Sequence, residues 1–213
     1  PVLLAALGSA ICSQVGVFNI ALEGQILIGS FVAIVANYYT GNVYMAVLCG
    51  VASGAAVASL VSILQVKYKA ADMVIGTSVN LLVSGLTSVL LYTILGVKGS
   101  FSSPQLKASD VYKRQYLYRT VQGFHVQSIG KNEEAAGSLG IKTLKTQMIV
   151  VLVSGALCGL GGAVLSMGQV TLFSENMSSG RGYIAMASAS MGQNQPLFII
   201  ASRLFFGFCH AVG

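Results

Sequence analysis

The stretch Val43-Tyr-Met-Ala-Val-Leu-Cys-Gly-Val-Ala-Ser-Gly-Ala-Ala-Val-Ala-Ser-Leu-Val-Ser-Ile-Leu-Gln-Val66 contains 24 residues and no charged side chain. About 20 apolar residues are enough for a helix to cross the ~30 Å hydrocarbon layer of a membrane. Five other stretches are apolar, three of spanning length and two shorter: 20–38, 72–96, 146–169, 1–13 and 197–213. None of them alternates polar and apolar residues as barrel strands do. Because backbone in lipid must satisfy its own hydrogen bonds, the sequence predicts an all-α, polytopic transmembrane helix bundle.

The composition of the whole chain supports a membrane protein. Of its 213 residues, 54% are hydrophobic and only 8% are charged, whereas charged residues make up about a quarter of an ordinary soluble domain. The mean hydropathy is +0.76. So little polar side chain excludes a soluble enzyme, a disulfide-stapled secreted module and a disordered tail.

Small residues recur within the apolar stretches. Two of the spans carry one at every fourth position: Gly50, Gly54 and Ala58, and Gly155, Gly159 and Ala163. This spacing allows the close backbone approach through which helices associate in lipid, although glycine is common in any polytopic helix. The four cysteines have no CxxC spacing, and we interpret them as small core residues and not as metal ligands or disulfide partners: Cys12, Cys49, Cys158 and Cys209.

The basic residues predict which way the spans run. Ten of the twelve lie between Lys67 and Lys145, and cytoplasmic loops of membrane proteins carry an excess of Lys and Arg. We therefore expect Lys67 and Lys69 on the cytoplasmic side. The connection near 40–42 and the end of the third span near Gly96 should then lie outside, and the basic stretch that ends at Lys145 should again lie inside.

With the sides assigned in this way, the predicted spans cross the membrane one time too few. Residues 97–127 contain no apolar stretch long enough to return the chain to the cytoplasmic side. We therefore expect about one spanning helix to be missing near 105–118, with a junction near Asp110–Gln115. The chain also begins without Met and ends inside an apolar stretch, so we expect 1–213 to be a single transmembrane domain and a fragment at both ends.

The stretch Gly16-Val-Phe-Asn-Ile-Ala-Leu-Glu-Gly24 brings polar groups into an apolar region. Asn19 and Glu23 are four residues apart, which would place them on one face of a helix, and Glu23 is the only charged residue among the first 66. A carboxylate at membrane depth is costly unless it faces a cavity or a partner. The flanking glycines favour an interrupted helix. Two roles remain open for Glu23: capping a half-helix that braces the bundle, or direct contact with a transported solute.

The span at 72–96 carries a stripe of polar residues at steps of three or four, which is one helical face. Such a stripe suits a path for an uncharged polar solute, but Ser and Thr also form hydrogen bonds between membrane helices. Asn80 is the member whose amide its own helix backbone cannot satisfy. Together with the previous stretch, the candidate pathway residues are Asn19, Glu23, Thr77, Asn80, Ser84 and Thr87.

A second interrupted region follows near the end of the chain. The piece at 183–191 is too short to span a membrane, Gly192 can end it, and Pro196 can begin the next helix. The sequence therefore predicts a re-entrant half-helix. Tyr183-Ile-Ala-Met186 is similar to Asn19-Ile-Ala-Leu22, which hints at an internal repeat.

The stretch Lys131-Asn-Glu-Glu-Ala-Ala-Gly-Ser-Leu-Gly-Ile141 predicts a two-turn helix on the cytoplasmic side. Asn132 can cap it, acidic residues occupy its first turn, and a glycine ends it. Its small-residue surface suits docking into a groove on another protein, although an ordinary interfacial loop helix would have the same pattern. The residues that we assign to this contact are Glu133, Glu134, Ala135, Ala136 and Gly140.

Four of these motifs together resemble one family of membrane proteins. The Glu-Ala-Ala-x-x-x-Gly arrangement at 134–140 is similar to the coupling helix of ABC-importer permeases. The stretch at 16–24 resembles the signature of the branch that serves simple sugars, nucleosides and branched-chain amino acids, and 73–87 and 180–196 are similar to the same branch. The resemblance covers nearly the whole chain in order, and it is closest to permeases paired with lipoprotein nucleoside-binding proteins.

The resemblance implies a permease subunit in the cell membrane of a prokaryote. Its expected solute is a nucleoside first and a simple sugar next. Its expected partners are a second permease subunit, ABC ATPase subunits that act on a short cytoplasmic coupling helix at 132–140, and an extracytoplasmic solute-binding lipoprotein. The resemblance carries the pathway role onto Asn19, Glu23, Asn80 and Thr87, and the coupling role onto Glu134, Ala135, Ala136 and Gly140. The chain departs from the family at 97–118 and at Arg203 and His210.

Other functions fit the sequence less well. It contains no G-x-x-x-x-G-K-[ST] motif for ATP phosphates and no HExxH motif, so we expect no catalytic residue, metal or cofactor. The basic residues lie at the ends of apolar stretches, so we expect the lipid bilayer and not nucleic acid as a partner. The remaining alternative is an ion- or proton-coupled secondary transporter of a small uncharged polar solute. Such a protein usually needs several intramembrane carboxylates, and here Glu23 stands alone.

Overall fold

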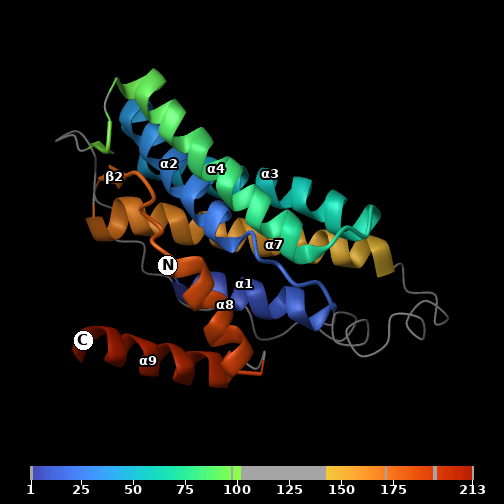
Figure 1. Cartoon of the computed structure of the whole chain (residues 1–213). Helices are drawn as coiled ribbons and strands as arrows, with labels where there is room; N and C mark the ends of the chain where they lie inside the picture. The colour runs from blue at the N-terminus through green and yellow to red at the C-terminus, as the bar shows by residue number, and fades with distance from the viewer. Residues whose placement is uncertain (1, 97, 102–142, 171, 194–195, 213) are drawn as a thin grey trace.

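The computed structural model describes residues 2–96, 98–101, 143–170, 172–193 and 196–212 (Figure 1). The described chain is almost entirely helical, in seven α-helices: α1 (Val2–Gln14), α2 (Leu22–Thr40), α3 (Val43–Ser62), α4 (Asp72–Leu95), α7 (Thr143–Val164), α8 (Arg181–Met191) and α9 (Pro196–Val212). Two of them continue as π-helix, α3 into η1 (Ile63–Lys67) and α7 into η2 (Leu165–Val170). This confirms the all-α helix bundle and the half-helix at α8.

Three helices are long and apolar enough to cross a membrane by length and composition: Val43–Lys67, Asp72–Leu95 and Thr143–Gly168. They match the spans expected at 43–66, 72–96 and 146–169. The stretch expected to span at 20–38 forms α2, but it is not among the three, because Glu23, Gln25 and Asn37 interrupt its apolar character. Thirteen of the 19 residues of α2 are buried, these three included. α2 is therefore an internal helix whose polar groups face protein, and a membrane crossing at 20–38 stays a prediction.

Glycines hold α2, α3 and α7 at very close range. A Cβ atom on Gly54 would lie 2.5 Å from the carbonyl oxygen of Gly155, and one on Gly29 would lie 2.6 Å from Cα of Gly159. No side chain fits at such distances, so glycine is required for the backbones to meet. We call this contact the glycine seam, and its residues are Gly29, Gly50, Gly54, Gly155, Gly159 and Gly162.

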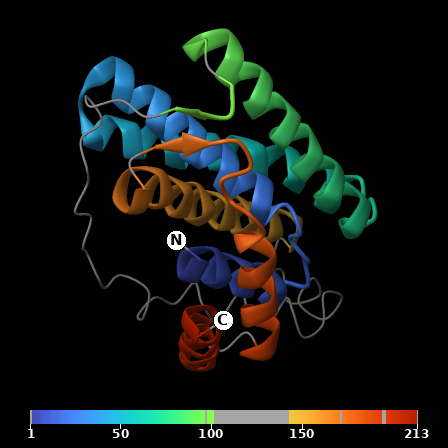
Figure 2. The same ribbon diagram turned by 60° about the vertical axis from the view of Figure 1, so that its left-hand side comes forward.

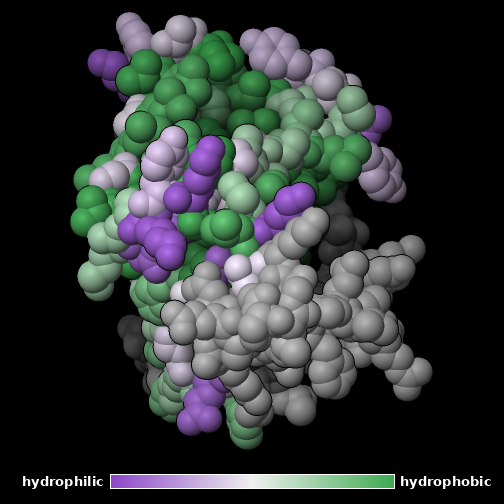
Figure 3. Space-filling view, turned by 90° about the vertical axis from the view of Figure 1, so that its right-hand side faces the viewer, coloured by the Kyte–Doolittle hydropathy of each residue, from purple (hydrophilic) through white to green (hydrophobic). Residues whose placement is uncertain are grey.

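The contacts also fix the directions of the helices. Along the seam, Gly50 meets Gly159 and Ala58 meets Gly155, so α3 and α7 are antiparallel. The C-terminal end of α3 and the N-terminal end of α7 therefore lie at the same end of the bundle. Exposed Lys67, Lys69 and Lys145 share this end, as the sequence predicts, and we call it the basic end. Figure 3 faces it and shows hydrophilic residues gathered among apolar ones.

The opposite end of the bundle is formed by the C-termini of α2 and α4. The two helices run side by side in the same direction (Figure 1), since Ile20 packs against Gly76 and Gly24 against Asn80. Each helix ends at a glycine in the left-handed conformation, with φ of 60° at Gly41 and 66° at Gly96. Such residues accept this conformation without a Cβ penalty.

A short two-stranded ribbon also lies at this opposite end. β1 (Ser100–Phe101) pairs antiparallel with β2 (Phe173–Ser174), and the ring of Phe101 packs edge-on against Tyr38 at 5.4 Å between centroids. Gly99 and Glu175 exchange two further hydrogen bonds beside the ribbon. The described chain therefore reaches Phe101 at one end of the bundle and resumes at Thr143 at the other.

The remaining helices lie on the other side of α7. α1 packs on α7 and α8, and α9 packs on α8 and α1 at the edge of the molecule (Figures 1 and 2). α8 begins next to the start of α2 and leads away from it toward α1. This arrangement brings the N-terminal ends of α2 and α8 together, and the candidate site lies there.

Candidate functional site

Residues 15–21 form an unwound link between α1 and α2, as expected of an interrupted helix. Gly16 has φ of 76°, a conformation that suits glycine. The freed backbone groups of the link are satisfied by side chains of three other segments. These hydrogen bonds run from Gln147 Nε2 to Val15 O at 3.2 Å, from Gln65 Nε2 to Phe18 O at 3.4 Å, from Asn80 Nδ2 to Ile20 O at 3.1 Å, and from Phe18 N to Asp72 Oδ2 at 3.2 Å.

The carboxylate of Glu23 joins α2 to α8. It accepts hydrogen bonds from the backbone N–H groups of Gly180 at 2.8 Å and Gly182 at 2.6 Å. Both N–H groups lie at the start of α8 and have no acceptor within that helix, and the helix dipole favours a negative charge at this place. Glu23 is 8% exposed. The geometry is the capping arrangement that the sequence left open as one of two roles, and contact with solute stays a prediction.

Asn80 links α4 to both of these helices. Its Oδ1 accepts from the N–H of Gly24 at 2.8 Å, and its Nδ2 donates to the carbonyl of Ile20 and to the hydroxyl of Tyr183, each at 3.1 Å. The amide is thus satisfied by α2, the link and α8. We call the set the polar junction, and its residues are Glu23, Asn80, Gly180, Gly182 and Tyr183.

Asn19 does not share a helical face with Glu23, contrary to the expectation from their spacing. It lies in the unwound link, before α2 begins, so the four-residue spacing no longer sets its direction. Its Nδ2 donates to Gln25 Oε1 at 3.3 Å and to Ser154 Oγ at 3.4 Å. Asn19 therefore faces α7 and lies outside the polar junction.

The other members of the predicted stripe form hydrogen bonds within α4. The hydroxyl of exposed Thr77 donates to Met73 O at 2.8 Å, and that of buried Thr87 donates to Val83 O at 2.9 Å. Ser84 is half-buried between them. Of the stripe, the structure brings only Asn80 into the polar junction. A pathway role for Thr77, Ser84 and Thr87 stays a prediction.

Two sets of predicted residues lie outside the described part of the chain. The coupling residues lie outside the described part of the chain: Glu133, Glu134, Ala135, Ala136 and Gly140. The side chains of Arg203 and His210 lie outside it as well. Within the described ranges, no three His, Cys, Asp or Glu residues come together as metal ligands.

Sequence reasoning missed several polar residues that the structure uses. Gln25, Gln65 and Gln147 each interrupt an apolar stretch, and this interruption was a readable signal. The only sequence signal at Tyr183 was its place in the four-residue repeat, where it corresponds to Asn19. That repeat does not match in structure, because 19–22 runs from the link into the start of α2 whereas 183–186 lies within α8.

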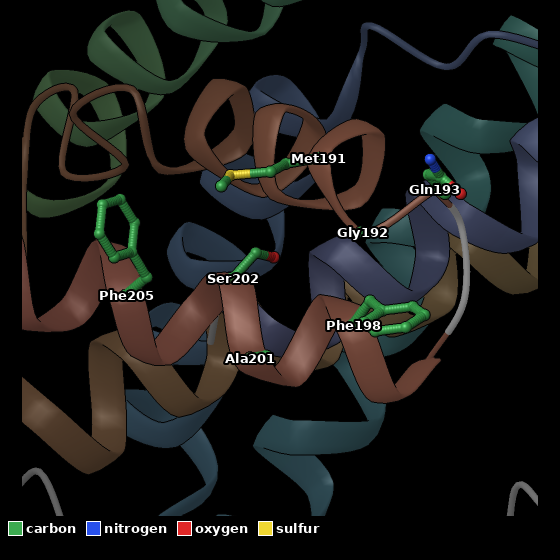
Figure 4. Close-up of a pocket in the computed structure, with 7 residues that line it drawn as sticks. All are labelled: Met191, Gly192, Gln193, Phe198, Ala201, Ser202 and Phe205. Atoms are coloured by element: carbon green, nitrogen blue, oxygen red, sulfur yellow. The ribbon is translucent and has the colours of Figure 1, made fainter.

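A separate pocket of about 430 Å³ lies between α8 and α9 (Figure 4). Its lining is mostly apolar, and the hydroxyl of Ser202 within it is already bonded to the carbonyl of Ser188 at 2.9 Å. The pocket contains no member of the polar junction. Its lining residues are Met191, Gly192, Gln193, Phe198, Ala201, Ser202 and Phe205.

Comparison with known proteins gives this architecture a family. The sequence model of one protein family, described as the permease component of the branched-chain amino acid transport system, matches residues 1–113 and 115–213. The chain belongs to this family. It is a permease subunit of the ABC-transporter class and a multi-pass protein of the plasma membrane, and such permease subunits are not themselves enzymes.

Three similar proteins align with nearly all of this chain. A guanosine ABC transporter permease of Bacillus subtilis is 27% identical over the full chain and 78% of its own length. A putative glucose ABC transporter permease of Haloferax volcanii is 26% identical over 99% of the chain and 72% of its length. A nucleoside ABC transporter permease of Lactococcus lactis is 27% identical over 97% of the chain and 76% of its length. No solved structure gives a significant match.

Proposed function

We propose that this permease forms the membrane pathway of an importer for nucleosides, with simple sugars as the next class of solute. The observation that carries the proposal is the similarity over nearly the whole chain to permeases named for guanosine and nucleoside transport. The glucose permease among the relatives supports sugars as the second class. The proposed pathway residues are Asn19, Glu23, Thr77, Asn80, Ser84 and Thr87.

The proposed partners are a second permease subunit, cytoplasmic ATPase subunits and an extracytoplasmic solute-binding lipoprotein. We assign the ATPase contact to 132–140. The position of α7 supports this assignment, because Thr143 starts that helix at the basic end. Gly140 is three residues earlier, and an extended chain of that length reaches only about 10 Å. The contact would therefore lie near Lys67 and Lys145, on the side that the basic residues mark as cytoplasmic.

In this proposal the polar junction transmits movement between helices. ATP-driven closure of the partner subunits shifts the coupling segment and α7, and the glycine seam passes the shift to α2. Glu23 and Asn80 then carry it to α8 and α4 through five hydrogen bonds to backbone and to Tyr183. Alternating access results when these helices change their tilt together.

We also propose that the chain lacks one spanning segment between β1 and α7. Phe101 and Thr143 lie at opposite ends of the bundle, and the sequence at 97–127 contains no apolar stretch long enough to span a membrane. The alignment with the guanosine permease extends over 248 positions against the 213 residues of this chain, a difference of 35, which is enough for one span. The family match is also interrupted at Arg114, within the junction expected at 110–115.

Solute uptake into proteoliposomes tests the function. The permease is reconstituted with its proposed partners, which are a second permease subunit, ATPase subunits and a solute-binding lipoprotein. It is used in two forms: the chain as it stands, and the chain with the corresponding segment of the guanosine permease inserted at Arg114. We expect ATP-dependent guanosine uptake that excess uridine reduces and excess glucose does not, and we expect it to be larger in the inserted form. Uptake without ATP, or uptake of glucose alone, would contradict the nucleoside importer.

A further inference from the structure

Tyr183 differs in position from the other exposed tyrosines of the described chain. Five of them lie at helix ends, where aromatic residues anchor membrane proteins at the interface: Tyr38, Tyr39, Tyr44, Tyr68 and Tyr92. Tyr183 is also near a helix start, in the first turn of α8, but this turn lies beside Asn80, which is eight residues from the start of α4 and fifteen from its end. These separations correspond to about 12 Å and 22 Å along the helix, so Tyr183 is not at an interface.

The direction of the Tyr183 side chain is also opposite to that of an interfacial anchor. An anchor directs its hydroxyl to water, whereas the hydroxyl of Tyr183 accepts a hydrogen bond from buried Asn80. Tyr183 as a residue is 44% exposed. Its polar tip is therefore held by the protein, while part of the residue remains exposed.

The ring is held at both of its ends. Asn80 binds the hydroxyl, and Glu23 binds the N–H groups of Gly180 and Gly182 just before the Tyr183 backbone. A group that is already ordered loses little conformational freedom when it contacts a ligand. Two charged side chains lie at this end of α8, and both have partners within the protein: the carboxylate of Glu23 accepts from two N–H groups, and the guanidinium of Arg181 donates to the carbonyl of Met177. Because neither charge lacks a partner, we expect an uncharged ligand.

We infer that the aromatic ring of Tyr183 is a stacking surface for the planar, uncharged base of the transported nucleoside. The inference rests on the proposed function and adds a specificity-determining residue to it. Bases stack on aromatic rings through their π-faces, and sugars have no such face. Tyr183 therefore favours nucleosides over sugars of similar polarity.

Kinetics of guanosine uptake by three variants of the complete transporter test the inference. Tyr183→Leu removes the ring, and we expect the KM to rise about tenfold. Tyr183→Phe and Tyr183→Trp keep an aromatic ring, so we expect the KM of both to stay within about twofold of the wild-type value. Both lose the bond from Asn80 to the hydroxyl, which is part of the junction that transmits movement, so their maximal uptake rate is expected to fall. If the KM of Tyr183→Phe rises as much as that of Tyr183→Leu, the bond to Asn80 is the important feature and the stacking role is overturned. An unchanged KM in Tyr183→Leu overturns it as well.

A second measurement asks whether the ring faces lipid. The chain contains no tryptophan, so Tyr183→Trp in the permease reconstituted alone provides one fluorophore. We expect little quenching by phospholipids with brominated acyl chains. Leu82→Trp on α4 is the control, since Leu82 is 65% exposed and should be quenched strongly. Equal quenching of the two overturns the inference, whereas failure of the wild-type transporter to take up any nucleoside would instead overturn the proposed function.

Discussion

The glycine seam and the polar junction both join other helices to α2, but they do so with different atoms. In the seam, backbone meets backbone with no side chain between, as where Gly29 meets Gly159. In the junction, Gly182 also lies close to the Glu23 backbone, but the side chains of Glu23 and Asn80 add hydrogen bonds to backbone N–H and C=O groups. Helices in lipid gain no hydrophobic free energy from one another. The bundle therefore uses two other kinds of contact in place of the hydrophobic effect. The seam requires positions without side chains, and the junction requires particular polar side chains.

The largest effect is expected from a side chain placed in the seam. Gly159 lies against Gly29, Gly50 and Gly54 at once, so Gly159→Leu must separate three helices. We expect a loss of about 3 kcal/mol or more in the free energy of unfolding, as for an overpacked core. The measurement is the yield and the melting temperature of the purified protein in detergent.

Gly85→Leu is the matched control for this prediction. Gly85 also lies within an apolar helix, but nothing is within 4 Å of its Cβ position. It should keep the wild-type melting temperature. Equal melting temperatures of the two leucine variants would show that the seam is not required for the fold.

A smaller and more local effect is expected from the junction. Glu23→Ala leaves the N–H groups of Gly180 and Gly182 without their acceptor, and we expect a loss of about 2–3 kcal/mol. The loss should be confined to α8, because the seam does not depend on these bonds. Hydrogen exchange should therefore become faster at residues 180–184 and stay unchanged in α3.

Glu175→Ala is the control with the same change of residue type. The carboxylate of Glu175 also accepts from a backbone N–H, that of Gly99 at 3.2 Å, but it is exposed. Surface substitutions of this kind change stability by about 0.5 kcal/mol or less. If exchange in α8 is equally fast in both variants, or unchanged in Glu23→Ala, the junction does not hold that helix.

The smallest effect on stability is expected from a substitution of Thr77. This substitution distinguishes a role in the fold from a role in transport. Its exposed hydroxyl bonds only to its own helix, so Thr77→Val should change the free energy of unfolding by about 0.5 kcal/mol or less. If Thr77 lines the pathway, guanosine uptake should still fall about threefold, the effect of one weak hydrogen bond. Thr93→Val is the control, because Thr93 is exposed and makes the same bond to Val89 at 2.9 Å. An equal fall in both variants would remove Thr77 from the pathway.

The two regions also differ in how far the sequence predicted them. The seam was readable because both partners carry the signal, small residues at every fourth position in α3 and α7. In the junction only one partner carries it. Glu23 and Asn80 are conspicuous in their apolar surroundings, but the N–H groups of Gly180 and Gly182 are backbone donors that every residue except proline possesses.

Errors in the sequence interpretation have the same physical origin. The four-residue spacing of Asn19 and Glu23 implies a shared face only if the helix is continuous, and the unwound link at 15–21 removes that condition. The sequence also could not show that Gln25 and Asn37 are buried, because their burial depends on which helices surround α2. The contact of Tyr183 was missed since its partner Asn80 lies 103 residues away in the sequence.

The ribbon of β1 and β2 restrains which parts of this bundle can separate. It ties the chain just after α4 to the chain just before α8, and Gly99 and Glu175, 76 residues apart, add two more bonds to the tie. α4 is thus joined by this ribbon to the segment between η2 and α8, and by Asn80 and Tyr183 to α8 itself. A relative movement of α4 and α8 that breaks the Asn80–Tyr183 bond would still leave α4 attached to the chain that leads into α8.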